Sequence, residues 1–541
     1  MVTTHQQTPH AGAGRRRPSP TWLAVAIVLL AAATDARPSA AADPVQKPRE
    51  DDYYRLISIA TSPASTGSRS KFWKPAPNGL TLEVSGMDLL DDRLAVAIRK
   101  GEVWLLSGVY EDPPEHVRYH RFANALHEPL GLLRDGDSFL TVQRTELTRL
   151  IDRDGDDVCD EYLTEAKGWG VTGNYHEYAY GPKRDGEGNL WLTLNIGLGL
   201  KSEHQRFLTT HPQLKVSQAP WRGWGLRVGA DGELEPMCAG MRSPSGLGAN
   251  LAGDMFYTDQ QGNWVGTNTL HHMRKGAFFH HIEALASAEL PSSPLKGITS
   301  VPSGVPFPEA LKQMPQLKAP AVWLPYKKVG QSATDIMVDA SNGKFGPFAG
   351  QLFVGEFTLS SVNRVFLEQV DGEYQGACFP FREGFASAVL RLTQGKDGSV
   401  FAGLTNRGWS SLGAASYGLQ RLVWTGRTPL EIREMRARPA GFELTFTKPV
   451  DAKSAGDITS YRMRSHTYLF QPQYGSDEIL ARDLEIQSAE VSADRLKVTL
   501  TVAGLRPYFV HELRADGVRG DAGEPLLHAD AYYTLNRIPA K

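Results

Sequence analysis

Several features that would assign a function class are missing from this 541-residue chain. Its three cysteines are too few for a disulfide framework, although one pair could bridge in an oxidising compartment. No CxxCH motif offers a site for covalent c-type haem, and the GxSxG, HExxH and phosphate-loop motifs are absent, which disfavours the enzymes built on them. With 58 basic and 60 acidic residues, the chain has no net field to attract nucleic acid. We therefore expect no nucleic-acid partner.

Long apolar runs are also missing, apart from one near the N-terminus. Arg15–Arg17 precede the run Trp22–Ala33, which is too short to span a bilayer comfortably, and the small residues Ala40–Ala42 offer a cleavage site before Asp43. This pattern predicts a signal peptide over 1–42 and an exported protein, periplasmic or extracellular, with at most a peripheral association with a membrane. An uncleaved membrane anchor and twin-arginine export are the alternatives.

The chain has 53 glycines, 34 prolines and one short phrase that occurs six times. In each copy a small polar turn precedes an apolar strand, as in RLAVAI or SVFAGL. The shortest spacings are 45 residues, from Leu94 to Phe139, and 48 residues, from Leu352 to Val400. A strand-and-turn repeat of this length is typical of propeller blades. The copies begin at Arg93, Ser138, Asn189, Asp254, Gln351 and Ser399.

These patterns predict an all-β chain made of a six-bladed β-propeller and a second domain. We expect a linker and a leading strand over 43–84, the propeller over 85–426, and a small C-terminal β-sandwich of the immunoglobulin or fibronectin type over 427–541, where short alternating strands are separated by turns. The widest gap between repeats holds a proline-rich insertion at 282–344, which we expect to be mostly loop and to shape the mouth of a central pocket.

The repeat region resembles the glucose/sorbosone dehydrogenase family of six-bladed propellers, and most closely a secreted bacterial branch described as membrane-bound dehydrogenase domains. Four phrases carry the resemblance, which covers about residues 80–430: HEPLGLL at His127, QRTELTRLIDRDGDDVCDEY at Gln143, MRSPSGLG at Met241 and LTNRGWSSLG at Leu404. The resemblance implies an oxidoreductase that uses pyrroloquinoline quinone (PQQ) to oxidise a sugar or related alcohol. Its electrons would pass to a separate carrier such as a cytochrome c.

The resemblance also implies a catalytic base. Family members place a histidine shortly before a GPDG-type turn and strand, and His176 holds that place in HEYAYGPKRDGEGNLWLTLN. A neutral imidazole suits removal of a hydroxyl proton near neutral pH. A structural histidine that hydrogen-bonds a blade turn is the alternative.

The family's cofactor contacts are only partly matched. An Arg-Asn pair contacts the quinone in family members; here Arg242 is retained and Ser243 replaces the asparagine. Arg242 could clamp a carboxylate, or form an ion pair between blades instead. Asn406 and Arg407 are further cofactor candidates. Lys327 and Lys328, in the insertion, are only weak candidates for the family's cofactor-binding lysine, and solvated loop lysines are the alternative.

Polar residues at the ends of the repeat phrases are candidates for the pocket wall, although such positions are also polar where a channel simply holds water. The candidates are Gln143, Arg144, Asn195, Asp259, Gln260 and Glu356.

An acidic loop follows the second repeat. Its carboxylates have the spacing of positions 1, 3, 5 and 9 of an EF-hand loop, which predicts a calcium site. Asp157 and Leu163 stand where an EF-hand has glycine and glutamate, so a metal-free acidic turn is the alternative. The predicted ligands are Asp152, Asp154, Asp156 and Asp160.

Two other function classes remain open. The same pocket could bind a carbohydrate or a partner without catalysis, or it could belong to a carbohydrate-active enzyme of the lyase or hydrolase type in which His176 acts without redox chemistry.

Overall fold

The fold is described from a computed structural model. The described residues are 48–62, 77, 79–172, 174–197, 219–298 and 300–540. The predicted signal peptide, 1–42, lies outside them.

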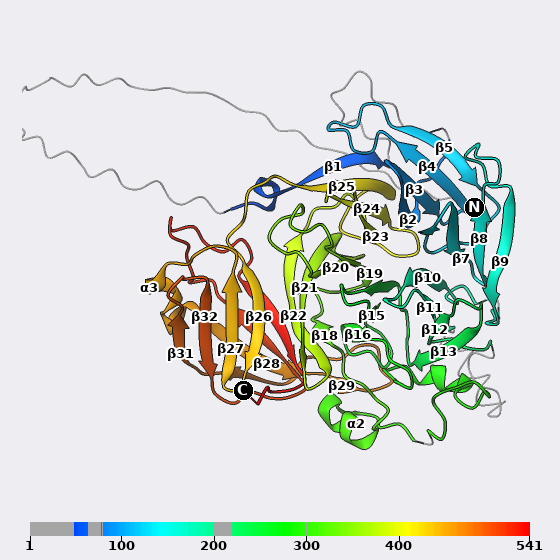
Figure 1. Ribbon diagram of the computed structural model, residues 1–541. Coiled ribbons are helices and arrows are strands. Elements are labelled where there is room, and N and C mark those ends of the chain that lie inside the picture. The colour runs from blue at the N-terminus through cyan, green and yellow to red at the C-terminus, as the bar shows by residue number, and fades with distance from the viewer. Residues whose placement is uncertain are drawn as a thin grey trace, which may run out of the picture. The chain divides into compact units, whose positions relative to one another are not determined.

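Six blades of four antiparallel strands surround one axis in the described part of the chain (Figure 1). The first three blades are β2 (Val84–Leu90), β3 (Arg93–Ile98), β4 (Glu102–Ser107) and β5 (Arg118–Ala123); β6 (Leu133–Asp135), β7 (Ser138–Val142), β8 (Glu146–Ile151) and β9 (Glu161–Lys167); and β10 (Ala179–Arg184), β11 (Leu190–Leu194), β12 (Trp224–Val228) and β13 (Leu234–Ala239). The last three are β14 (Gly246–Ala249), β15 (Met255–Asp259), β16 (Asn268–His272) and β18 (Val322–Leu324); β19 (Ala333–Val338), β20 (Leu352–Glu356), β21 (Ser361–Val370) and β22 (Glu373–Arg382); and β23 (Val389–Gln394), β24 (Val400–Thr405), β25 (Tyr417–Trp424) and β1 (Tyr54–Thr61). The predicted six-bladed propeller is confirmed.

The ring is closed by the strand that comes first in the chain. β1 pairs antiparallel with β25, with Leu56 opposite Leu422, and so supplies the outer strand of the last blade. The other three strands of that blade come from the end of the propeller. Because the last blade needs both ends of the propeller sequence, its sheet holds the ring together.

Each repeated phrase forms the second strand of its blade: β3, β7, β11, β15, β20 and β24. These strands are buried on both faces, because each blade packs between two neighbours. The innermost strands come close together at the axis, and three of them, β2, β10 and β14, contain glycine. A Cβ atom on Gly246 of β14 would lie 1.9 Å from the Thr334 carbonyl oxygen of β19, so only glycine fits there.

The insertion at 282–344 lies mostly outside helices and strands, as predicted, but it also contains two blade strands that the sequence did not indicate, β18 and β19. Both are short or flanked by turn residues, which hides them in the sequence. The insertion also holds η2 (Ile282–Ser287), β17 (Val305–Pro306) and α2 (Phe307–Gln313).

The C-terminal domain consists of two sheets that bury one apolar core between them, as a β-sandwich does. Phe442 and Leu500 of one sheet and Met463 and Leu513 of the other belong to this core. One sheet is β26 (Ile432–Arg438), β27 (Gly441–Phe446), β32 (Lys497–Val502) and β31 (Ile486–Val491); the other contains β34 (Asp530–Leu535), β33 (Phe509–Arg514), β28 (Arg462–Thr467) and β30 (Ile479–Leu484). Short elements beside them are α3 (Ala452–Ala455), η3 (Ile458–Ser460) and β29 (Leu469–Phe470). The immunoglobulin or fibronectin subtype stays a prediction.

The second sheet of the sandwich continues a propeller blade. β22 pairs with β34, with Cys378 opposite Tyr532, so blade five and four C-terminal strands form one eight-stranded sheet (Figure 1). The predicted boundary near 427 therefore separates the domains along the chain but not in their hydrogen bonding. Removing the C-terminal strands would expose the edge of β22.

A buried histidine links the two ends of the described chain. His528 bonds the carboxylate of Glu431 at 2.7 Å and that of Glu50, in η1 (Glu50–Asp52), at 3.0 Å. Burial alone would lower the pKa of His528, but the two carboxylates outweigh it and raise the pKa to about 9. The histidine is therefore protonated at neutral pH.

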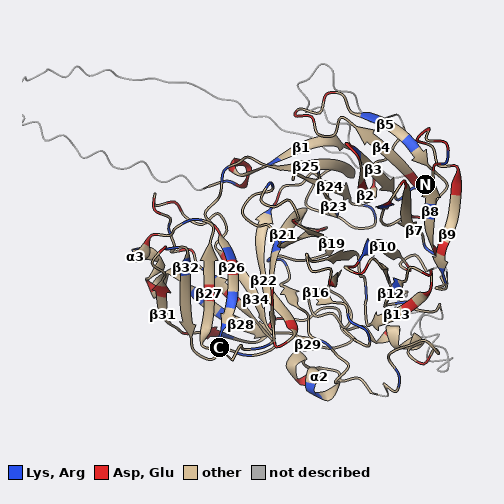
Figure 2. Cartoon of the chain, in the orientation of Figure 1, with Lys and Arg blue, Asp and Glu red and all other residues tan. Residues whose placement is uncertain are grey.

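Charges of both signs are interspersed over the propeller and the sandwich (Figure 2). Among the described residues, no helix is long and apolar enough to cross a membrane. Cys159, Cys238 and Cys378 are all free, so the disulfide that one pair could have formed is not present.

Candidate functional site

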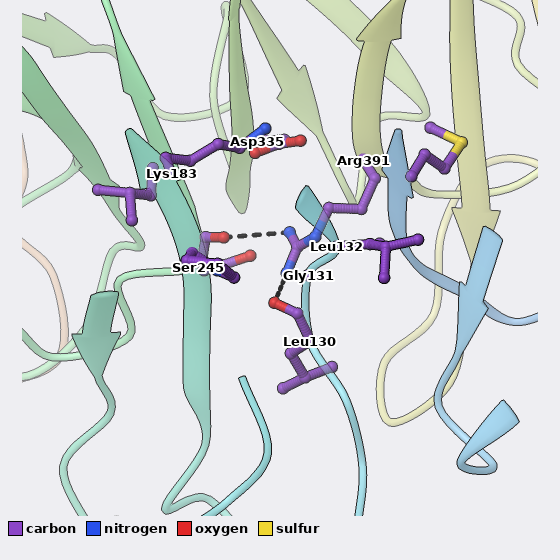
Figure 3. A pocket seen from close by; sticks show the side chains of 12 residues that line it. Leu130, Gly131, Leu132, Lys183, Ser245, Asp335 and Arg391 are labelled. Carbon is purple, nitrogen blue, oxygen red and sulfur yellow. Dashed lines mark hydrogen bonds between the residues drawn. The ribbon is translucent and has the colours of Figure 1, made fainter. Parts of the chain in front are cut away.

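A single arginine fills the propeller axis. Arg391 of β23 donates from Nε to the Ser85 carbonyl at 2.9 Å, from Nη1 to the Ser245 carbonyl at 3.1 Å and from Nη2 to the Leu130 carbonyl at 3.2 Å. Figure 3 shows its guanidinium between Ser245 and Leu130. Three blades thus share one side chain, which blocks the channel and gives the propeller a floor.

A cavity of about 490 Å³ lies against this floor, with Leu130, Ser245 and Leu390 in its wall. This volume is in the range of sites for small molecules. Seven aromatic side chains line the cavity: Tyr175, Tyr178, Tyr180, Tyr326, Phe357, Trp409 and Tyr474. Neutral polar side chains contribute amides and hydroxyls: Asn195, Ser243, Gln260, Gln261, Gln331, Ser332 and Thr405. The charged or titratable lining is Arg99, Arg242, Arg407 and His176, with no carboxylate among the described lining residues.

His176 presents an unbonded imidazole to the cavity. Its main chain is fixed, because its N–H donates to Asn174 at 2.9 Å and its carbonyl accepts from Asn195 Nδ2 at 2.7 Å. Its ring forms no hydrogen bond to a described residue. Partial burial and the positive charges of Arg242 and Arg144 lower the pKa of His176. The imidazole is therefore neutral at neutral pH, with a lone pair available to accept a proton.

Arg242 is a buried guanidinium without a counter-ion in the described structure. It is 8% exposed, and Nε has no hydrogen-bond partner. The guanidinium carbon lies 5.4 Å from the centre of the Tyr474 ring. Burial lowers the pKa of Arg242. A buried unpaired charge is costly, so this group is well suited to bind an anion that enters the cavity.

Asp259 holds the turn that carries Arg242. One carboxylate oxygen accepts from the N–H of Arg242 at 2.7 Å, and the other accepts from Ser243 at 2.8 Å and Gln260 at 2.9 Å. Burial raises the pKa of Asp259 to about 6. Asp259 is therefore a positioning residue behind the wall rather than part of the lining.

Glu356 has the same kind of role one blade later. It is fully buried and accepts from the N–H groups of Ser332 at 2.7 Å and Gln331 at 3.1 Å, the two lining residues that precede β19. Burial raises the pKa of Glu356 to about 7. The carboxylate fixes the loop and does not face the ligand space.

Two arginines support the tyrosine wall. Arg99 donates to the Tyr178 hydroxyl at 3.1 Å and to Glu128 at 3.1 Å. Arg144 donates to the same Glu128 and to the Tyr175 carbonyl at 2.8 Å, with its guanidinium 4.8 Å from the Tyr178 ring centre. Arg144 thus lies behind Tyr178 and fixes it in place.

The structure brings together six of the predicted cofactor and pocket residues in the lining: His176, Asn195, Arg242, Ser243, Gln260 and Arg407. The other five were wrongly predicted to line it: Gln143, Arg144, Asp259, Glu356 and Asn406. Gln143 bonds Thr148 at 2.7 Å, and Arg407, although it lines the cavity, pairs with Glu83 at 2.8 Å. These residues do lie at the ends of the repeated strands, as predicted. A side chain at such a position can nevertheless turn away from the cavity and form hydrogen bonds with a neighbouring loop.

The aromatic residues were missed by sequence reasoning. Tyr175 and Tyr178 lie on either side of His176, and Trp409 lies two residues after Arg407. These three could have been found, because they are close to residues that the repeat had already indicated. Tyr474 was not, because it comes from the C-terminal domain.

The loop that carries Tyr474 is tied to blade four by backbone hydrogen bonds. The Gly475 N–H donates to the Gly262 carbonyl at 2.9 Å, the Ser476 N–H donates to Gly266 at 2.9 Å, and the Trp264 N–H donates to Gln471 at 3.0 Å. The C-terminal domain therefore contributes directly to the cavity wall.

The acidic loop, which connects β8 to β9 within blade two, is separate from the cavity. Carboxylate oxygens of Asp152, Asp154 and Asp156 lie within 4.8 Å of one another, as a cation site requires. Asp160 does not join them and instead accepts from the Arg153 N–H at 2.7 Å. Calcium binding by this loop stays a prediction, with three of the four predicted ligands brought together.

Lys328 does not reach the cavity. Its ammonium group lies 2.7 Å from Glu478 and also pairs with Glu512, in a cluster with the buried His466. The lysine therefore links the insertion to the C-terminal domain.

No protein-family model matches the chain, and no curated protein matches it by sequence. Among solved structures, a Thermus thermophilus protein described provisionally as an oxidoreductase (glucose dehydrogenase) has 16% identity over 68% of this chain and 100% of its own, with a TM-score of 0.45. The PQQ-bound aldose sugar dehydrogenase of Streptomyces coelicolor has 13% identity, coverages of 68% and 98%, and a TM-score of 0.42. The apo-form of the soluble aldose sugar dehydrogenase of Escherichia coli has 12% identity, coverages of 68% and 99%, and a TM-score of 0.41. At these scores and identities the matches say nothing about chemistry, and the propeller is established by its own sheets. The relation of this chain to glucose and aldose sugar dehydrogenases is thus a distant likeness of fold.

Proposed function

We propose that the cavity is the active site of an exported, PQQ-dependent dehydrogenase that oxidises a sugar or related alcohol. The observation that carries this proposal is the combination of a neutral, unbonded His176 imidazole with the unpaired guanidinium of Arg242 in one small-molecule cavity. The resemblance in sequence phrases points the same way.

The cavity fits an anionic cofactor in its charge. PQQ carries carboxylates, and the lining offers three arginines and no carboxylate among its described residues. Arg242 would hold one carboxylate through charged hydrogen bonds, with the Ser243 hydroxyl beside it. Arg99 and Arg407 already pair with Glu128 and Glu83, so their contribution would be weaker. When bound, the quinone supplies a two-electron acceptor for hydride.

His176 would act as the general base. Oxidation of an alcohol removes the proton from the hydroxyl oxygen and a hydride from the carbon that carries this hydroxyl. One ring nitrogen of His176 would take the proton. The lowered pKa of His176 leaves the imidazole neutral at neutral pH, so this nitrogen can accept it. The side chains of Asn195 and Gln260 line the same space and can orient neighbouring hydroxyls.

Two further parts of the proposal concern partners. The electrons would leave through a separate acceptor such as a cytochrome c, and calcium would bind at the acidic loop of Asp152. A calcium ion within the cavity itself would have only neutral oxygens as ligands from the described lining.

The second candidate function is carbohydrate binding or cleavage without redox chemistry. The many neutral amides and exposed aromatic rings of the lining favour it, because they suit a sugar and need no cofactor.

The test is reconstitution of the purified protein with PQQ and calcium, followed by dye reduction with glucose, galactose and xylose. We expect saturable, PQQ-dependent reduction that falls at least about 100-fold in His176→Ala. His120→Ala, on outer strand β5, serves as the matched control and should keep full activity. Absence of PQQ-dependent reduction with all three sugars would overturn the dehydrogenase. Sugar binding without reduction would support the second candidate.

A further inference from the structure

We infer that the C-terminal domain completes the substrate site, and that Tyr474 is an aromatic platform for a second sugar unit, so that the substrate is an oligosaccharide or the end of a glycan chain. This inference rests on the part of the proposed function that makes the ligand a sugar.

Tyr474 is held at the cavity by its backbone. After Tyr474, the backbone N–H groups of Gly475 and Ser476 donate to blade four. Before it, the Pro472 carbonyl accepts from the Asn263 side chain of blade four at 2.8 Å. None of these bonds uses the tyrosine ring. A loop that its backbone holds in place, and whose ring uses no hydrogen bond to do so, is what a contact platform needs.

The ring of Tyr474 is largely open to solvent. It is 57% exposed, although the guanidinium of the buried Arg242 lies over the ring, 5.4 Å from its centre. On another part of the lining, Trp409 is 64% exposed and Tyr175 is 49% exposed. Large aromatic rings exposed around one cavity mark a binding surface.

The chemistry of the lining selects a carbohydrate. A sugar ring has an apolar face of C–H groups and an edge of hydroxyls, and aromatic rings with a polar tip suit such amphipathic ligands. Amides and hydroxyls dominate the rest of the lining, with Asn195 Oδ1 buried and unpartnered beside them. A lipid chain would leave these polar groups unsatisfied.

The arrangement also separates two binding zones. Arg242, Ser243 and Asn195 are buried and form a polar inner zone, and the more exposed His176 lines the same cavity. The exposed rings of Tyr474 and Trp409 form an outer zone. A monosaccharide that occupies the inner zone leaves the outer rings uncovered, whereas a second or third unit covers them. Tyr474 adjoins Arg242, so it would contact the unit next to the one that reacts.

The experiment measures binding to the full-length protein by calorimetry, without quinone or dye. The ligands are glucose with cellotetraose, glucose with maltotetraose, and xylose with xylotetraose. We expect at least one tetraose to bind about tenfold or more tightly than its monomer. Tyr474→Ala should weaken that tetraose about three- to tenfold and leave the monomer within about twofold, as expected for one stacked ring. Tyr474→Phe should keep wild-type affinity.

Tyr162→Ala, an exposed tyrosine on the outer strand β9, is the matched control and should change neither ligand. Binding of no tetraose, equal binding of every tetraose and its monomer, or equal losses for both ligands in Tyr474→Ala would overturn the inference. In a separate calorimetric titration with PQQ, a loss of PQQ affinity in Tyr474→Ala, together with an unchanged ratio of tetraose to monomer affinity, would also overturn it, since Tyr474 would then contact the cofactor. Because no turnover is measured, failure of the dehydrogenase proposal would not mimic any of these results.

Discussion

The link through His528 predicts a specific loss of stability at alkaline pH. The pKa of His528 is raised from its ordinary value of 6.5 to about 9 by Glu431 and Glu50. A raised histidine pKa stabilises the folded state fully below the unfolded pKa, and this stabilisation is lost as the pH rises through the folded pKa. At 1.36 kcal/mol per pKa unit, the total is about 3 kcal/mol, most of it present at pH 7 and lost by about pH 10.

The perturbation that isolates this histidine is His528→Gln, compared with wild type at each pH. Other groups titrate in the same range, so the quantity of interest is the difference between the two proteins in their free energy of unfolding in urea. At about pH 7 the variant should be less stable by about 2–3 kcal/mol, and the pH-dependent part of the difference should fade toward pH 10. A difference that stays constant from about pH 6 to pH 10 would show that His528 is not protonated in the folded protein, and would refute the reasoning.

Three further predictions concern the site. The acid limb of kcat/KM should lie below about pH 6.5, because burial and the neighbouring Arg242 and Arg144 lower the pKa of His176; a limb at or above that pH would contradict a base of this kind. Asp259→Asn should weaken PQQ binding about tenfold in calorimetry, because an amide cannot accept from all three N–H groups that fix the Arg242 turn, whereas unchanged binding would deny Asp259 its positioning role. Calcium at about 1 mM should raise the thermal midpoint by about 1–3 °C in wild type and by less in Asp154→Asn, while no shift in wild type would indicate a metal-free acidic turn.

The propeller was predictable because its strongest pattern is local. The second strand of every blade is buried on both faces, so strands such as β11 and β20 stand out as apolar phrases after a turn. The inner strand β14 is a short run of glycine and small residues, and β18 is three residues long. Nothing in a sequence of that length distinguishes a strand from a loop, which is why these two strands were not predicted.

The residues of the cavity were less predictable, because the orientation of side chains and contacts between distant parts of the chain determine which residues line it. Asp259 and Glu356 lie at the strand ends that the repeat indicated, yet both carboxylates turn to bind backbone N–H groups rather than a ligand. Tyr474 reaches the cavity only because β34 pairs with β22 and docks the C-terminal domain on blade five. No periodicity within either domain encodes that contact.

The central claim is that a cavity built around Arg242 and His176 holds PQQ for sugar oxidation. Calorimetric titration of the purified protein with PQQ in the presence of calcium tests it most directly. We predict saturable binding to wild type, and binding about 30- to 150-fold weaker in Arg242→Ala, as expected for the loss of about 2–3 kcal/mol of charged hydrogen bonding to a carboxylate. Absence of binding to wild type, or equal affinity in the variant, would contradict the claim.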